Sequence, residues 1–138
     1  MKKKIFLTSL LVYSLFLLWH MFLGPYRVSL SNYRYNLIHF KTIYLYLKGA
    51  NKIGFFYFTI NIIGNIGMFF PIGFLFFYLG RNFFLIKIII SSLIFITFLE
   101  FLQLTFKVGI FDIDDIILNT FGITLGFIFM KGHTYEKI

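Results

Sequence analysis

Residues 83–106, FFLIKIIISSLIFITFLEFLQLTF, are apolar over most of their length and contain only two charged side chains, Lys87 and Glu100. An α-helix needs about 20 such residues to cross a hydrocarbon core of roughly 30 Å. Lipid offers the backbone no hydrogen-bond partners, so a helix is the structure that satisfies this segment internally. The apolar residues are continuous rather than alternating, which argues against a barrel strand. The stretch therefore predicts a transmembrane helix.

Three further apolar runs occur on either side of it, at Ile5–Leu23, Phe55–Leu79 and Ile116–Met130. The last run is short alone, but extended back to Asp112 it gives roughly 28 Å of helix. The first run follows three lysines and is longer than the h-region of a signal peptide, so we interpret it as an uncleaved helix. We predict an all-α fold, a single polytopic membrane domain over residues 1–138 with four transmembrane helices at about 5–23, 55–79, 83–106 and 112–130.

The composition agrees with a membrane protein. The chain of 138 residues is 59% hydrophobic and 13% charged, whereas soluble domains are roughly 25% charged. Its net charge of +8 does not predict nucleic-acid binding, because the basic residues lie in loops between apolar runs, where membrane topology explains them. The absence of cysteine excludes disulfides and thiolate zinc sites, and the three histidines are too scattered to form a metal pair.

The loop Gly24–Gly54 has no acidic residue but carries five basic ones, among them Arg27. We expect part of it, roughly Leu37–Leu47, to lie in the membrane interface. The lysines at positions 2–4 favour a cytoplasmic N-terminus, and four helices would return the C-terminus to the same side. This orientation places the basic loop outside, which conflicts with the positive-inside rule.

Several polar side chains interrupt the second predicted helix. Asn61 and Asn65 share one face, Gly64 and Gly67 are expected to admit a neighbouring helix, and Pro71 is expected to weaken the helix and free a backbone carbonyl. The asparagines could belong to a functional site, or could serve only to hold helices together through hydrogen bonds.

Glu100 and Gln103 share a face of the third predicted helix. A charged carboxylate at this depth costs about 3 kcal/mol even on insertion scales. Glu100 must therefore meet a partner or a wet cavity, or hold a proton. Contact with Lys107 or with an asparagine would make it a packing residue, whereas intramembrane carboxyls are functional candidates by default.

An acidic block, Asp112-Ile113-Asp114-Asp115, precedes the fourth apolar run. If a helix begins here, one stripe contains Asp112, Asp115, Asn119, Gly122 and Gly126. The glycines form a packing surface, and helix capping would explain Asp112 and Asp114. Clustered carboxylate oxygens also suit Mg²⁺ or Ca²⁺, so the three aspartates are candidate metal ligands.

Four polar segments follow one another in a distinctive order: Asn36-Leu37-Ile38-His39-Phe40, Asn61 and Asn65 with Pro71 and Gly73, Glu100 with Gln103, and Asp112-x-Asp114-Asp115 with Asn119 and Gly122. This order resembles the VanZ-like family of bacterial membrane proteins over roughly residues 36–129. The sequence departs from the family pattern in having His39 where a proline is usual. Ahead of the acidic block, where the family often has an arginine, only Lys107 is close.

The VanZ-like family is named for low-level resistance to teicoplanin, a glycopeptide that binds cell-wall precursors. The resemblance implies a bacterial cell-membrane protein that contributes to glycopeptide resistance or envelope homeostasis. Its partners would be membrane lipid and, beyond that, a lipid-linked wall precursor or the glycopeptide itself.

Three other hypotheses remain open, although the pattern favours a binding protein over an enzyme. The plainest is a structural membrane protein whose polar residues only pack against one another. An enzyme acting on a polyprenyl- or phospholipid phosphate would use the aspartates to hold Mg²⁺ and Glu100 as acid or base. A small transporter would use Glu100 as a proton carrier and would dimerise through Gly122 and Gly126.

Overall fold

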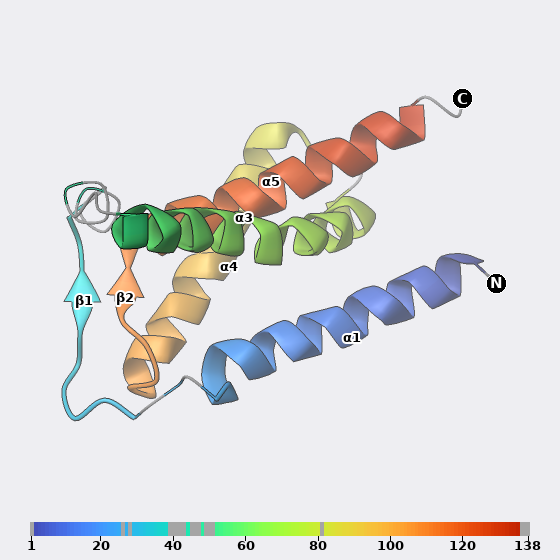
Figure 1. Ribbon diagram of the computed structural model, residues 1–138. Coiled ribbons are helices and arrows are strands. Elements are labelled where there is room, and N and C mark those ends of the chain that lie inside the picture. Colours follow the sequence, from blue (N-terminus) through green and yellow to red (C-terminus); the bar gives the residue numbers. More distant parts are fainter. Residues whose placement is uncertain are drawn as a thin grey trace.

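The computed structural model describes residues 2–25, 27, 29–38, 44, 48, 52–80 and 82–135. The described chain contains four long helices and two short strands (Figure 1). In chain order they are α1 (Lys2–Leu23), β1 (Tyr35–Asn36), α3 (Lys52–Gly80), α4 (Leu85–Thr105), β2 (Phe111–Asp112) and α5 (Ile113–Tyr135). The predicted all-α fold is therefore confirmed, and the helix boundaries differ from the predicted ones by only a few residues, except at the C-terminal end of α5.

All four helices are long and apolar enough to cross a membrane. Large apolar side chains cover the outside of the bundle, for example Leu15 and Trp19 on α1, and Ile90 and Ile94 on α4. Lipid is the environment in which such a surface is stable, so the chain is a multi-pass membrane protein. Both termini lie at the same end of the bundle (Figure 1).

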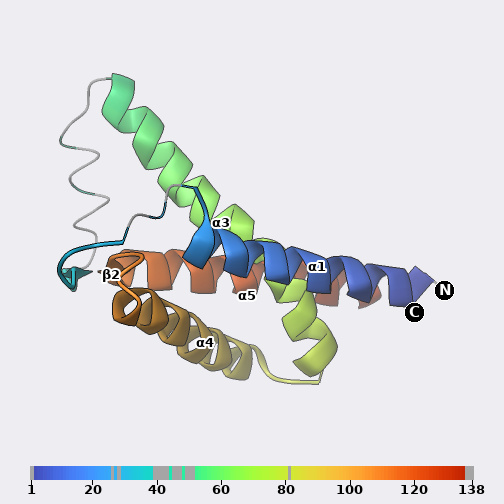
Figure 2. The same ribbon diagram turned by 90° about the horizontal axis from the view of Figure 1, so that it is seen from below.

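Helix α5 packs against both α3 and α4, and it makes its most extensive contact with α3. Its side chains Ile123 and Phe127 are fully buried, as is Ile96 on α4. Helix α1 lies along the side of this group (Figure 2) and contributes Leu17 and Met21 to the core. The core is thus built around α5, the helix that begins with the acidic block.

Glycines allow the close contact between α3 and α5. A Cβ at Gly126 would collide with the backbone oxygen of Phe70, and one at Gly73 with the backbone of α5. The predicted packing surface at Gly122 and Gly126 is confirmed, and because α3 of the same chain covers it, it is not free for dimerisation. The expectation for Gly64 and Gly67 is wrong, since a Cβ at either would meet no atom within 4 Å.

The short strands connect the first loop to the start of α5. Strand β1 pairs in parallel with β2, with Tyr35 opposite Phe111 and Asn36 opposite Asp112. Most of the predicted interfacial segment, residues 37–47, lies outside the described residues, as does His39. The strand pair fixes the part of the loop that reaches the functional site.

Candidate functional site: a polar cavity at one end of the bundle

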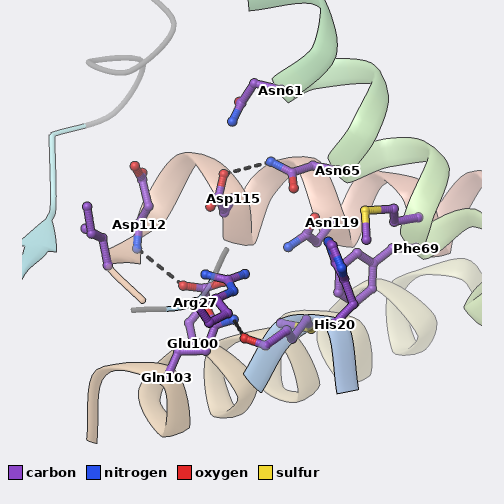
Figure 3. Close-up of a pocket in the computed structure, with 13 residues that line it drawn as sticks. His20, Arg27, Asn61, Asn65, Phe69, Glu100, Gln103, Asp112, Asp115 and Asn119 are labelled. Carbon is purple, nitrogen blue, oxygen red and sulfur yellow. Dashed lines mark hydrogen bonds between the residues drawn. The ribbon is translucent and has the colours of Figure 1, made fainter. Parts of the chain in front are cut away.

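A cavity of about 400 Å³ lies at the end of the bundle opposite the termini. The C-terminal ends of α1 and α4, the first turns of α5 and the N-terminal half of α3 surround it (Figure 3). Its lining residues are His20, Met21, Arg27, Asn61, Asn65, Met68, Phe69, Glu100, Gln103, Ile110, Asp112, Asp115 and Asn119. Most of these side chains can form hydrogen bonds, in contrast to the apolar exterior of the bundle.

Two residues of α4 connect this helix to its neighbours. Glu100 is only 2% exposed, and its Oε2 accepts a hydrogen bond from the backbone N–H of Asp112, at 3.4 Å. Gln103 donates from Nε2 to the backbone oxygen of Met21, at 3.0 Å. The first bond places a carboxylate at the positive end of α5, and the second satisfies a carbonyl in the last turn of α1.

Asp112 acts as a cap for α5, as the capping interpretation of the acidic block predicts. Its Oδ1 accepts a hydrogen bond from the backbone N–H of Asp114, at 2.9 Å. The side-chain amide of Asn36 donates to both carboxylate oxygens of Asp112, at 3.2 Å. The loop strand β1 therefore helps to hold the first carboxylate of the site.

Asp115 lies within the first turn of α5 and faces α3. Its Oδ1 accepts a hydrogen bond from Nδ2 of Asn65, at 2.8 Å. Asn65 therefore does join two helices, as the structural interpretation of the asparagines predicts. Asn61 lies one turn away and also lines the cavity (Figure 3), and within the described part of the chain it has no hydrogen-bond partner.

Asn119 follows one turn after Asp115 and is 2% exposed. Within the described residues, its Oδ1 has no hydrogen-bond partner, and neither does Oγ1 of the neighbouring Thr120. An unpaired buried polar atom costs about 1–3 kcal/mol. Asn119 is thus a buried residue that lines the cavity and has an amide oxygen free to accept a hydrogen bond.

Two predicted site residues do not line the cavity. Asp114 is as buried as Glu100 but does not line the cavity, although its backbone N–H donates to Asp112. The second is Pro71, which lies within the continuous helix α3. The nearby backbone oxygen of Met68 accepts a hydrogen bond from the hydroxyl of Tyr13, at 2.7 Å.

Among the described residues, no three His, Asp or Glu side chains are grouped so as to hold a metal ion.

Arg27 and His20 line the cavity, although the sequence analysis did not identify them as site residues. Arg27 interacts electrostatically with Glu100 and Asp115 and donates a hydrogen bond to the backbone oxygen of Val108. The predicted contact between Glu100 and Lys107 is wrong, because Nζ of Lys107 lies over the ring of Tyr33, 4.7 Å from its centroid. The sequence did contain a signal for Arg27. Buried carboxylates need a basic partner, and the first loop has basic residues but no acidic ones to pair with them.

The fold and the cavity together define a polytopic helical membrane protein with a polar site enclosed at one end. A sequence model of the VanZ/LLP1 family matches residues 6–133, so the chain belongs to the VanZ/LLP1 family. The match begins within α1, which places that helix inside the family domain. No curated protein and no solved structure matches the chain.

Proposed function

We propose that this VanZ/LLP1 protein binds the polar head group of a membrane amphiphile in its cavity, and that a lipid-linked wall precursor is the amphiphile. Through this binding it lowers susceptibility to teicoplanin-type glycopeptides. The observation that supports the proposal is the cavity itself, where side chains of α1, α3, α4, α5 and the first loop present hydrogen-bonding groups.

The position of these groups supports a binding role. Ionisable residues within membrane helices are costly and usually mark a binding site or a transport pathway. Glu100, Asp112 and Asp115 each accept a hydrogen bond from within the chain, and all three also line one shared cavity. A purely structural set of polar contacts would pack these side chains against one another, whereas here they line a cavity of about 400 Å³.

The size of the cavity indicates which part of an amphiphile it could hold. Its volume of about 400 Å³ is at the lower end of the roughly 300–1,000 Å³ typical of ligand pockets. That space accommodates part of a head group, such as one end of a wall precursor, and the apolar exterior of the bundle would accompany the acyl or prenyl chain. A precursor held in this way would be shielded from a glycopeptide.

The first test is susceptibility to teicoplanin and vancomycin in a sensitive Gram-positive host that expresses the chain. Asp115→Asn is the site variant, because it keeps the shape of the side chain but removes its charge. Asp114→Asn is the matched control, because Asp114 is buried one position away and does not line the cavity. All proteins are compared at equal abundance in the membrane.

We expect the wild type and Asp114→Asn to raise tolerance to teicoplanin and Asp115→Asn to lose that effect. If the wild type gives the same susceptibility as an empty vector, the proposed role in glycopeptide resistance is wrong. If Asp115→Asn protects as well as the wild type, the cavity is not the site responsible.

A further inference from the structure

The charges around the cavity are unbalanced. Three carboxyl side chains line it, from Glu100, Asp112 and Asp115, whereas Arg27 supplies the one guanidinium among the described lining residues. An anionic guest such as a phosphate would add repulsion to this group of carboxyls. A cationic guest would reduce the repulsion and would allow the carboxylates to remain charged.

The unpaired amide oxygen of Asn119 indicates where in the cavity a guest would bind. Asp115 and Asn119 are four residues apart on α5, so their Cβ atoms lie about 5–6 Å apart on one face. One oxygen of Asp115 accepts from Asn65, and within the described chain its other oxygen has no partner. Rotation of the Asn119 amide about its soft terminal torsion would bring Oδ1 toward a guest beside Asp115.

We propose that the guest carries a primary ammonium group, which binds between the carboxylate of Asp115 and the amide oxygen of Asn119. This inference rests on the proposed function and names the chemical class of its ligand. A primary ammonium is compact and carries three donors, and it can therefore satisfy both acceptors at once. Glu100 on α4 and Asp112, which directly precedes α5, also line the cavity and add attraction.

The same geometry distinguishes a primary ammonium from related head groups. A trimethylammonium group carries the charge but has no N–H donor, so it leaves Oδ1 of Asn119 unpaired. A glycerol head group offers donors but no positive charge. Only the primary ammonium matches both the charge of the carboxyls and the hydrogen-bonding capacity of Asn119.

The test uses the purified full-length chain in nanodiscs made from equal amounts of phosphatidylethanolamine, phosphatidylcholine and phosphatidylglycerol. Native mass spectrometry reports which lipids stay bound after release from the disc. We expect retention of phosphatidylethanolamine to exceed that of phosphatidylcholine about tenfold, as one hydrogen bond to a charged group implies. Soluble ethanolamine is added in a second arm, where displacement of the lipid shows that the amine alone is recognised.

Four variants separate a binding effect from a folding effect. Asp115→Asn and Asn119→Leu are expected to remove the preference, and Asp114→Asn to keep it. Asn119→Asp adds a charged acceptor of the same shape, so it should preserve or increase the preference. Each variant is first required to elute as a single species with wild-type helical content, because a misfolded protein would lose lipid without informing on the site.

The outcomes distinguish failure of this inference from failure of the proposed function. If phosphatidylglycerol is retained in preference to phosphatidylethanolamine and Asp115→Asn abolishes that preference, the guest does not carry a primary ammonium group. The cavity would still be a site for a lipid head group. Equal retention of all three lipids, unchanged in every variant, would overturn both.

Discussion

At the scale of single residues, the tightest contact in the bundle is the one that Gly126 makes possible. A Cβ added there would collide with the backbone oxygen of Phe70, which cannot rotate away as a side chain can. We therefore predict that Gly126→Ala lowers the free energy of unfolding by about 1–3 kcal/mol, the range for overpacking. Gly132→Ala is the control, because a Cβ at Gly132 in the same helix meets nothing within 4 Å. Thermal unfolding in mild detergent measures both, and an equal effect of the two substitutions would contradict the contact.

At the scale of elements, α1 has fewer contacts with the other helices than α3 and α5 have with each other. One of its links is the hydrogen bond from the Tyr13 hydroxyl to the backbone oxygen of Met68. We predict that Tyr13→Phe destabilises the protein by about 1 kcal/mol, the net value of a typical hydrogen bond. Tyr33→Phe removes the same hydroxyl from a residue that is 60% exposed and should have no measurable effect. Unfolding by a graded series of denaturing detergent tests the pair, and identical midpoints would exclude a stabilising bond at Tyr13.

At the scale of the whole molecule, we expect the cavity to open on the outer side of the membrane, with both termini in the cytoplasm. The basic first loop argued against this orientation, but Arg27 lines the same cavity as the carboxyl groups of Glu100 and Asp115. These carboxyl groups offset part of the positive charge of the loop. The chain has no cysteine, so Ser31→Cys and His133→Cys place one exposed thiol at each end of the bundle. In intact cells, a membrane-impermeant maleimide should label the first variant and not the second. The reverse pattern would place the cavity in the cytoplasmic half.

The four helices could be predicted from sequence because each apolar run has the length that lipid requires. The stripe of Asp112, Asp115 and Asn119 could also be predicted, since helical periodicity places these residues on one face and excludes Asp114. The position of Arg27 in the same cavity as Glu100 could not, because an irregular loop brings together positions that are far apart in the chain. The sequence likewise shows where α3 has glycines. Only the position of α5 in the structure shows which of those glycines cannot be replaced by a larger residue.

The hydrogen-bond partners of the residues at the start of α5 have a consequence for how this helix enters the membrane during synthesis. Asp112 is held by Asn36 and Glu100, and Asp115 by Asn65, and all three partners precede α5 in the chain. During synthesis they leave the ribosome first, so α5 meets two amide donors and one carboxylate acceptor instead of bare lipid when it inserts. We expect the acidic block, which would resist entering the membrane alone, to be accepted because the earlier helices are already there to receive it.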